Sequence, residues 1–287
     1  MIVIRLRSGL GNQMFQYAFF LQMQQWYGKD KVKLDIDTFH WKAHNGRELD
    51  KVFGIDLAQD AIPAAVSLKM ADVGYDIKSK VLRRLRGSKH KHYLFWKQLQ
   101  YENYRHLPEH VYLEGYWNEE IYFRDVAGKV RSIYRFPQPQ DSANRKLLRT
   151  VEAMVSVGVH VRRGDYIRYP DILPMCSAAY YRQAAQIIRT KTRDEPHFYV
   201  FSDDPEWCRN NINLDGDTVF VDINAGKDAW KDMMLMSHCR HQIIANSTFS
   251  WWAAWLNPNA GKIVIYPSST TKTYASMPDA WLMLHVD

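Results

Sequence analysis

The second half of the chain alternates short apolar runs with longer segments in which apolar residues recur at helical spacing. The runs are rich in Val, Ile and Phe, which favours buried strands, and the longer segments favour helices. Five strands are predicted, at residues 155–161, 198–202, 218–222, 241–245 and 262–266. Four helices are predicted between them, at residues 177–189, 205–211, 227–240 and 249–256. Strands that alternate with helices in this way predict a parallel, doubly wound sheet.

The first half opens with the same pattern. Residues 2–6 and 32–36 predict strands, and residues 13–27 between them predict a helix that Gly28 can end. Further along, only a basic helix near residues 79–86 and a strand near 111–114 can be predicted before residue 120. The most linker-like stretch is PQPQ at residues 137–140. The pattern therefore predicts an α/β protein of two Rossmann-like domains, residues 1–140 and 141–287, with a cleft between them.

Composition excludes several classes of protein. Of 287 residues, 46% are apolar and 24% charged, which is ordinary globular usage and excludes disordered and collagen-like chains. The three cysteines form no CxxC pair, so the sequence predicts neither a disulfide framework nor a zinc cluster. The sequence has no signal-peptide pattern and no apolar run of about 18 residues, so a soluble cytoplasmic protein is expected.

Positive charge is concentrated in the first half of the chain. Residues 1–150 hold 25 Lys and Arg against 16 Asp and Glu, a net charge of +9, whereas residues 151–287 hold 13 against 15, a net charge of −2. Residues 78–97 contain eight Lys and Arg and no acid, with aromatic and leucine side chains between them. This segment is either a solvated helical face or a peripheral contact with an anionic membrane surface. No nucleic-acid-binding signature accompanies it, so nucleic acid is not an expected partner.

The strongest candidate for chemistry is HVRRGDY at residues 160–166, where a predicted buried strand ends. Ligands of parallel α/β sheets bind at the carboxyl ends of the strands. Two adjacent arginines followed by a glycine turn offer forked cationic donors, which suit the geometry of a phosphate. The alternative is a pair of surface arginines, one of them in an ion pair with Asp165.

Two further motifs follow predicted strands and open helices. In FSDDP, at residues 201–205, an aspartate either caps the helix or accepts hydrogen bonds from a nucleotide base or ribose. No other oxygen ligands cluster near this pair in the sequence, so a metal site is not supported there. In ANSTFSWW, at residues 245–252, the hydroxyls and N–H groups at a helix N-terminus suit an anion, or they merely cap the helix.

The turn after the first predicted strand, GLGNQ at residues 9–13, is only a weak match to the dinucleotide fingerprint GxGxxG. Asp35 and Asp37 form a DxD pair of the kind that binds metal in some sugar-nucleotide enzymes, but this pattern is common by chance. The phosphate-loop pattern GxxxxGK[ST] and the hydrolase patterns GxSxG and HExxH are absent from the sequence.

Together these motifs resemble the galactoside α-1,2-fucosyltransferases of bacteria and animals. The resemblance rests on GLGNQMFQYA at residues 9–18, LEGYWNEEIYF at 113–123, HVRRGDY, FSDDP and ANSTFSWW, which follow in that order over nearly the whole chain. It implies a GT-B-like glycosyltransferase that moves L-fucose from GDP-β-L-fucose to the 2-hydroxyl of a terminal galactose. The reaction would invert the anomeric centre and need no metal or other cofactor. The sequence lacks the membrane anchor of the animal relatives, so a bacterial form is expected.

The resemblance also implies roles for individual residues. Arg162 and Arg163 would meet the diphosphate, and His160 with Asp203 or Asp204 would read guanine. The other substrate-binding residues are expected to be Gly11, Asn12, Gln13, Ser202, Asn246, Ser247, Thr248, Phe249 and Ser250. The N-terminal domain would mainly bind the acceptor, a galactose-terminated oligosaccharide or glycolipid, and the C-terminal domain would bind GDP-fucose.

Two questions stay open at this point. Asp165 is either the base that takes the proton of the acceptor hydroxyl or a structural partner of the arginines, because a carboxylate beside arginine is a weak base. The chain is either this enzyme, a fucosyltransferase of another linkage or acceptor, an enzyme that uses another GDP-sugar, or a non-catalytic protein that binds carbohydrate or nucleotide. The arginine pair argues against the last, since a binding protein has no leaving group whose charge must be stabilised.

Overall fold

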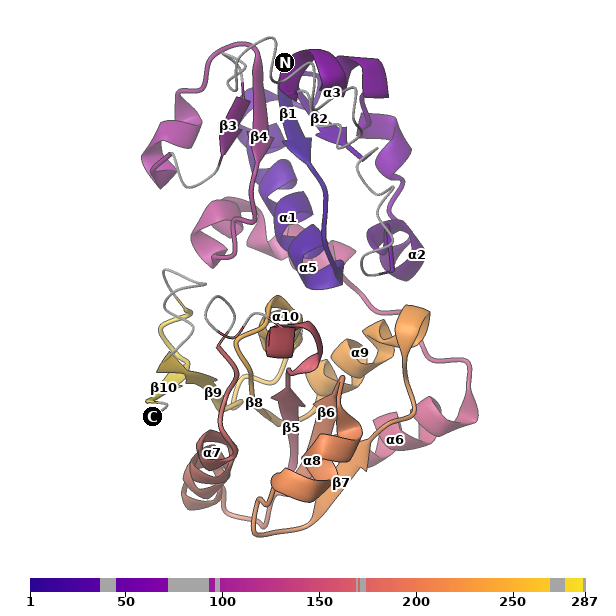
Figure 1. Ribbon diagram of the computed structural model, residues 1–287, viewed down its shortest axis with the longest axis vertical. Coiled ribbons are helices and arrows are strands. Elements are labelled where there is room, and N and C mark those ends of the chain that lie inside the picture. The colour runs from indigo at the N-terminus through magenta and orange to yellow at the C-terminus, as the bar shows by residue number, and fades with distance from the viewer. Residues whose placement is uncertain are drawn as a thin grey trace. The chain divides into compact units, whose positions relative to one another are not determined.

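The computed structural model describes residues 1–36, 45–71, 93–95, 99–168, 170, 174–268 and 277–285. They form two compact units, Met1–Arg135 and Phe136–Asp287, and each is built on its own parallel sheet (Figure 1). The domain boundary expected after residue 140 falls in the irregular stretch just before the first helix of the second unit.

The first unit contains a four-stranded parallel sheet of order β2-β1-β4-β3. Its strands are β1 (Ile2–Arg5), β2 (Val32–Asp35), β3 (Tyr93–Phe95) and β4 (Val111–Glu114). Its α-helices are α1 (Leu10–Tyr27), α2 (Leu49–Phe53), α3 (Ala64–Ala71) and α5 (Ala127–Ile133). Shorter 3₁₀ turns are η2 (Leu57–Asp60), η4 (Tyr101–Arg105) and η5 (Glu120–Val126).

The predictions for this unit are confirmed where the pattern was clear. Strands β1, β2 and β4 lie where apolar runs predicted them, and every residue of β1 and β4 is buried, as in a sheet covered on both faces. Helix α1 begins at Leu10 rather than Gln13, because Gly9 already has the extended conformation of an N-cap. It ends at Gly28, whose φ of 90° favours glycine. The predicted helix at 79–86 and most of the basic segment 78–97 lie outside the described residues.

The second unit contains a six-stranded parallel sheet of order β10-β9-β8-β5-β6-β7. Its strands are β5 (Ser156–Val161), β6 (His197–Ser202), β7 (Thr218–Val221), β8 (His241–Ile243), β9 (Val264–Pro267) and β10 (Leu282–Leu284). Its α-helices are α6 (Ser142–Ala153), α7 (Ala178–Lys191), α8 (Pro205–Asn211), α9 (Trp230–His238) and α10 (Thr248–Leu256). Two 3₁₀ turns, η6 (Gly164–Arg168) and η7 (Gly226–Asp228), complete it.

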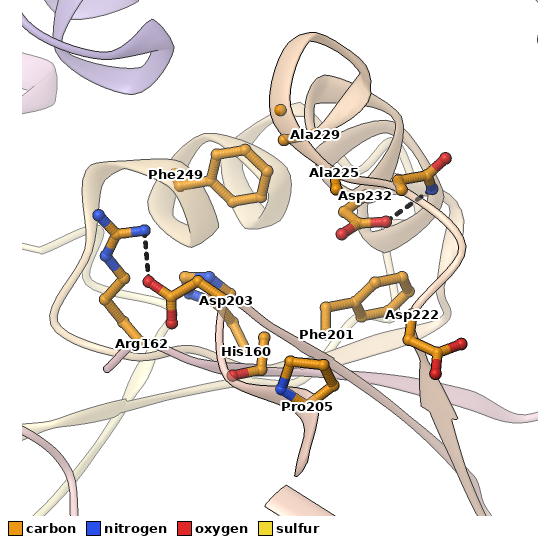
Figure 2. Close-up of a pocket in the computed structure, with 13 residues that line it drawn as sticks. His160, Arg162, Phe201, Asp203, Pro205, Asp222, Ala225, Ala229, Asp232 and Phe249 are labelled. Atoms are coloured by element: carbon orange, nitrogen blue, oxygen red, sulfur yellow. Dashed lines mark hydrogen bonds and ion pairs between the residues drawn. The ribbon is translucent and has the colours of Figure 1, made fainter. Parts of the chain in front are cut away.

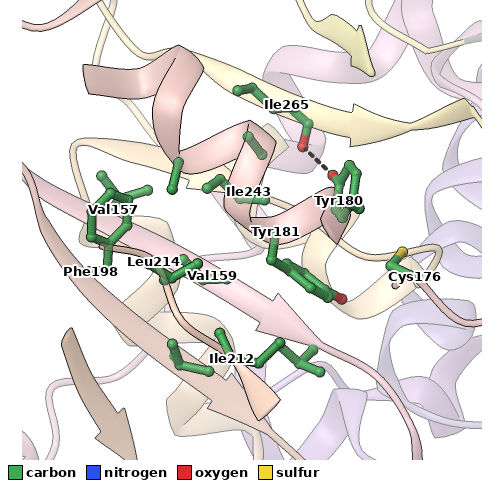
Figure 3. Packing of buried hydrophobic residues seen from close by; sticks show 14 of the residues in the cluster. Val157, Val159, Cys176, Tyr180, Tyr181, Phe198, Ile212, Leu214, Ile243 and Ile265 are labelled. Atoms are coloured by element: carbon green, nitrogen blue, oxygen red, sulfur yellow. Dashed lines mark hydrogen bonds between the residues drawn. The ribbon is translucent and has the colours of Figure 1, made fainter. Parts of the chain in front are cut away.

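All five strands predicted in this unit are present, and the predicted parallel sheet is confirmed. Its core lies between α7 and the centre of the sheet, where apolar side chains of β5, β6, β8 and β9 meet the helix (Figure 3). Tyr180 of α7 reaches through this core, and its hydroxyl donates to the carbonyls of Ile244 at 2.7 Å and Ile265 at 3.2 Å. A helix fixed to two strands at once holds the loops at the ends of those strands in place.

Candidate functional site

The order of the strands in the sheet of the second unit reverses at β5. The chain proceeds from β5 to β6 and β7 on one side, and β8 then pairs with β5 on the other side. Loops that leave β5 and β8 therefore diverge at the carboxyl edge, where ligands of such sheets bind. HVRRGDY continues from β5 into the first of these loops, and ANSTF lies in the second. The hydroxyl of Tyr166 joins the two motifs by donating to the carbonyl of Asn246 at 2.6 Å.

A pocket of about 350 Å³ lies at this edge of the sheet (Figure 2). It is lined by His160, Arg162, Phe201, Ser202, Asp203, Pro205, Asp222, Asn224, Ala225, Gly226, Ala229, Asp232 and Phe249. Arg162 and Asp232 lie on opposite sides of it; the ring of Phe249 lies between them, and the ring of Phe201 lies on the side of Asp232. The pocket thus has a side with the guanidinium of Arg162, a side with the carboxyl of Asp232, and apolar walls.

Two carboxylates hold Arg162 at the wall of the pocket. Its guanidinium lies 2.8 Å from the Asp203 carboxylate and 2.6 Å from that of Asp165. Its side chain is 28% exposed, and the two ion pairs hold it in place. Asp165 is more exposed than Arg162 and does not line the pocket. A guanidinium fixed on two sides is an oriented donor.

Arg163 is placed differently, although it is the next residue. Its Nε donates to Asp204 at 3.1 Å, and its guanidinium lies 3.7 Å from the ring centre of Trp207 in α8. Arg163 does not line the pocket. The structure therefore separates the two predicted catalytic arginines: Arg162 faces the pocket and Arg163 packs against α8.

A glycine, Gly164, follows the two arginines. A Cβ at this position would lie 2.4 Å from Asp203 Oδ2, so any side chain there would displace the Asp203 carboxylate from its contacts. Asp203 also accepts a hydrogen bond from the backbone N–H of Arg163 at 2.9 Å. The glycine thus lets the loop after β5 close onto the loop after β6.

The two aspartates of FSDDP have different tasks. Asp203 lines the pocket, but Arg162 and the Arg163 backbone already donate to its carboxylate. Asp204 is the N-cap of α8 and accepts from the backbone N–H of Trp207 at 3.2 Å, while its own N–H donates to Ser202 Oγ at 3.0 Å. Asp204 has the capping role that the sequence left as the alternative to base recognition.

His160 is buried under the pocket beside Phe249, with 5.4 Å between the ring centres. Burial, and secondly the positive charge of Arg162, lowers the pKa of His160 from 6.5 to about 3. The imidazole is therefore neutral at physiological pH. Its Nδ1 makes no hydrogen bond within the described parts of the chain.

The segment ANSTF mainly supports the pocket from behind. Ser247 caps α10 and accepts from the N–H of Phe249 at 3.3 Å, and the buried hydroxyl of Ser250 faces the carbonyls of Ala245 and Ser247. Asn246 is buried, and neither atom of its side-chain amide has a hydrogen-bond partner in the described residues. Thr248 is half-buried, and within this segment Phe249 is the residue that lines the pocket.

Asp232 is a pocket residue that the sequence analysis missed. It lies in α9, and burial raises the pKa of its carboxyl from 3.8 to about 7, although a hydrogen bond from Asn224 Nδ2 at 2.7 Å lowers it in part. Perturbed carboxyl groups of this kind cluster at functional sites. The signal in the sequence was one acid among the apolar residues DMMLM of a predicted helix.

Gly11, Asn12 and Gln13 belong to the first unit, at the start of α1. Gln13 is fully buried: its amide donates to the carbonyls of Ser8 and Gly46 and accepts from the N–H of Glu48. Gly11 is buried as well. Gln13 therefore positions its loop and has no side-chain atom at the surface, whereas Asn12 is half-buried and bonds Ser8 Oγ at 3.0 Å.

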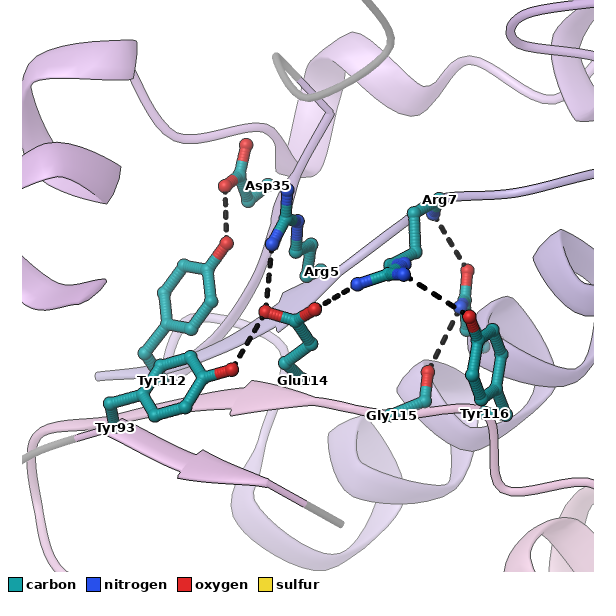
Figure 4. A network of polar contacts seen from close by, with 9 residues as sticks. Arg5, Arg7, Asp35, Tyr93, Tyr112, Glu114, Gly115 and Tyr116 are labelled. Atoms are coloured by element: carbon teal, nitrogen blue, oxygen red, sulfur yellow. Dashed lines mark hydrogen bonds and ion pairs between the residues drawn. The ribbon is translucent and has the colours of Figure 1, made fainter. Parts of the chain in front are cut away.

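The DxD pair does not form a described metal site. Asp35 is buried and accepts from the Tyr112 hydroxyl, next to a network in which Arg5, Arg7 and Tyr93 all contact Glu114 (Figure 4). Asp37 lies outside the described residues. Nowhere in the described ranges are three His, Cys, Asp or Glu side chains grouped as metal ligands. The helices described also include none that is long and apolar enough to cross a membrane.

Comparison with known proteins identifies a family over nearly the whole chain. The model of "Glycosyl transferase family 11" matches residues 1–283. An "Alpha-1,2-colitosyltransferase" of Escherichia coli is 30% identical over 99% of this chain and 98% of its own. A "Galactoside alpha-(1,2)-fucosyltransferase 1" of Leontocebus fuscicollis is 31% identical over 61% of this chain and 52% of its own.

A solved structure shares the fold. The crystal structure of fucosyltransferase NodZ from Bradyrhizobium matches with a TM-score of 0.50, over 90% of this chain and 92% of that one, at 15% identity. With the two parallel sheets, this match confirms the predicted fold class, a GT-B-like α/β protein with two Rossmann-like domains.

Proposed function

Because the chain belongs to glycosyl transferase family 11, we propose that it moves L-fucose from GDP-β-L-fucose to the 2-hydroxyl of a terminal galactose. The linkage formed is α-1,2, the anomeric centre inverts, and no metal takes part. The observation that carries this proposal is the pocket at the carboxyl edge of the second sheet, with Arg162 on one side and Asp232 on the other.

The side of the pocket with Asp232 suits guanine. A carboxylate accepts hydrogen bonds, and guanine offers two adjacent donors, N1–H and the N2 amino group, where adenine offers no such pair. Asp203 already accepts from two arginine groups, so Asp232 is the pocket carboxylate better placed to read the base. The rings of Phe201 and Phe249 supply apolar surface for a flat base.

The side of the pocket with Arg162 suits the diphosphate. When the bond between fucose and phosphate breaks, negative charge develops on the departing GDP, and an oriented guanidinium stabilises it. Arg162 can do this because two carboxylates fix its plane beside the pocket. We assign Arg163 the supporting task of holding the loop after β5 against α8.

The acceptor hydroxyl must lose a proton during transfer. Asp165 is the nearest carboxylate in sequence, but it lies 2.6 Å from Arg162 and outside the pocket lining, which favours its role as a partner that orients Arg162. A dissociative transition state lowers the demand for a strong base. The first unit would hold the acceptor, and among Gly11, Asn12 and Gln13 it is Asn12 whose side chain is not buried.

The second candidate is colitosyl transfer. It is favoured by the full-length match to the E. coli α-1,2-colitosyltransferase. Colitose lacks the 3-hydroxyl of fucose. GDP-colitose and GDP-fucose therefore differ only at one position of the sugar. Fucosyl transfer to another hydroxyl or acceptor would use the same pocket.

The test is a panel of donors and acceptors. Purified protein is incubated with GDP-fucose, GDP-colitose or an ADP-sugar, together with β-galactosides, and the linkage of each product is determined by NMR. We expect an α-1,2-fucosyl galactoside. A product formed only from GDP-colitose, or with another linkage, would replace the first candidate, and GDP binding without any transfer would indicate a binding protein.

A further inference from the structure

Four polar side chains connect the start of α6 with the pocket. Asp141 is the N-cap of α6 and accepts from both the backbone and the side-chain amide of Asn144. Asn144 and Asn224 form a closed pair, in which each amide nitrogen donates to the other's oxygen at 2.8 and 2.9 Å. Asn224 then donates its second hydrogen to Asp232 at 2.7 Å. Asn144 itself is buried and does not line the pocket.

The hydrogen-bond directions in this chain depend on one another. An amide nitrogen carries two hydrogens, and here both hydrogens of Asn144 and both of Asn224 are used. Hydrogen bonds from Asn144 and Lys231 lower the pKa of Asp141 to about 2, so this group is a carboxylate that only accepts. If the Asn144 amide turned over, its oxygen would face that carboxylate. Asp141 therefore fixes the orientation of Asn144, and the closed pair passes this orientation to Asn224.

The orientation of Asn224 decides which form of Asp232 is stabilised. With its nitrogen toward Asp232, the amide donates to a carboxylate. With its oxygen toward Asp232, the amide would accept from a protonated acid. Only the first arrangement is compatible with Asp141 as a carboxylate.

We propose that Asn144 and Asp141 are positioning residues for the donor nucleotide, which act through Asn224 to keep Asp232 a carboxylate aimed at the pocket. This inference rests on the proposed function, in which the pocket takes GDP. It adds two residues outside the pocket to those that determine recognition of the base. Burial raises the pKa of Asp232 to about 7 even with the hydrogen bond from Asn224 in place, so the relay acts on a group that titrates near neutral pH.

Other titratable and charged groups lie around Asp232. They are Arg162 and the neutral His160 from β5 and its loop, Asp203 after β6, Asp222 after β7, Lys231 directly before Asp232 in sequence, and Asp228 four residues before it. Lys231 pairs with Asp141 at 3.1 Å and Asp228 at 3.4 Å. The hydrogen bond from Asn224 is the specific interaction that lowers the pKa of Asp232.

Two variants separate the relay from the ion pair. Asp141→Asn keeps a good N-cap, so α6 stays capped, but an amide can donate as well as accept and no longer fixes Asn144. Asn144→Ala removes the relay and leaves the ion pair of Asp141 with Lys231 in place. The matched control is Asp56→Asn, which makes the same change at the N-cap of η2 in the first unit.

GDP binding is measured by calorimetry from pH 5.5 to 9 on the full chain. For the wild type we expect affinity to rise with pH through about 7. For both variants we expect the midpoint to rise by about one pH unit, with affinity about tenfold weaker at pH 6 and equal to wild type at pH 9. The double variant should match the single ones, since both act through one path.

A pH curve of either folded variant that superimposes on that of the wild type would overturn the relay, and Asp56→Asn must show no shift. If Asn144→Ala fails to fold, Asp141→Asn alone decides. Wild-type protein that binds no GDP at any pH would instead refute the proposed function.

Discussion

Replacing Arg162 by alanine should reduce kcat/KM about 500-fold. Arg162 is the arginine that lines the pocket, and removing one oriented donor of a developing charge costs about 3 kcal/mol, or a factor of about 100, in kcat. A loss of GDP affinity adds to this, because the substitution also leaves a carboxylate without its ion pair in the pocket wall.

This loss of GDP affinity comes from the aspartates. Arg162 and Arg163 are surrounded by three carboxylates, Asp165, Asp203 and Asp204. The cluster already has a formal charge of −1, so it binds a diphosphate through directed N–H groups rather than through net charge. Without Arg162, the Asp203 carboxylate at the pocket wall loses its ion pair and repels the phosphates. Unit charges about 4 Å apart in water repel by about 1 kcal/mol, which weakens GDP binding about fivefold.

The assay combines steady-state kinetics with calorimetry of GDP binding. In Arg162→Ala, kcat should fall about 100-fold and GDP affinity about fivefold. The double variant Arg162→Ala with Asp203→Asn should recover the affinity but not kcat. Arg162→Lys should recover little of kcat, since an ammonium group cannot bond two carboxylates in one plane.

Arg189→Ala is the control, because this arginine is also held by a carboxylate, Glu195, but contacts the amino-terminal ends of the strands. It should leave both constants unchanged. A folded Arg162→Ala protein whose kcat/KM stays within tenfold of the wild type would refute the assignment of Arg162 to the diphosphate.

Three further predictions concern other parts of the chain. The pKa of the Asp232 carboxyl is about 7 in the folded protein and 3.8 in the unfolded chain, so the protonated acid favours folding. This contribution to the free energy of unfolding is complete below pH 4 and is lost as pH rises through 7. Asp232→Asn should therefore raise the free energy of unfolding by about 2 kcal/mol at pH 8, allowing for partial exposure, and leave it unchanged at pH 3 by denaturant titration; equal values at pH 8 would contradict this. Transfer should persist in excess EDTA, and loss of activity that Mn²⁺ restores would indicate a metal site. Residues 78–97 should bind anionic vesicles at low salt and release them at high salt in co-sedimentation, since each cation contributes about 1 kcal/mol; no binding at low salt would leave this segment a solvated face.

The sheet of the second unit could be predicted because its central strands are buried on both faces. Every residue of β5 is buried, and such strands appear in a sequence as nearly continuous apolar runs. The strands that sequence analysis missed are β3 and β10, which have three residues each and no fully buried position. A short strand at the edge of a sheet has too few buried positions to produce a pattern.

Only those parts of the site that lie at the ends of predicted strands could be predicted from the sequence. HVRRGDY and FSDDP were each predicted at the end of a strand, and the structure joins them through the contacts of Asp203. The sequence treated Arg162 and Arg163 as equivalent donors, but successive side chains of an extended chain point to opposite sides. Asp232 was missed because α9 brings it to the pocket, and no local pattern shows which helix residue meets the end of a distant strand.

The strand order in the two units also explains why GLGNQ lies where a ligand-binding loop is expected, although it is not a dinucleotide fingerprint. In the first unit, β1 has β2 on one side and β4 on the other, as β5 has β6 and β8. GLGNQ therefore follows β1 at the same kind of position that HVRRGDY occupies after β5, the point where the strand order reverses and ligands bind. Ser8, just before this motif, has a φ of 72°, which is strained for a residue other than glycine. Gln13 and Asn12 both bond to Ser8 and hold this strained turn. Strain maintained by side-chain amides at a strand end is typical of a binding loop. Because Gln13 is buried and Asn12 is half-buried, Asn12 is the first residue to test for contact with the acceptor.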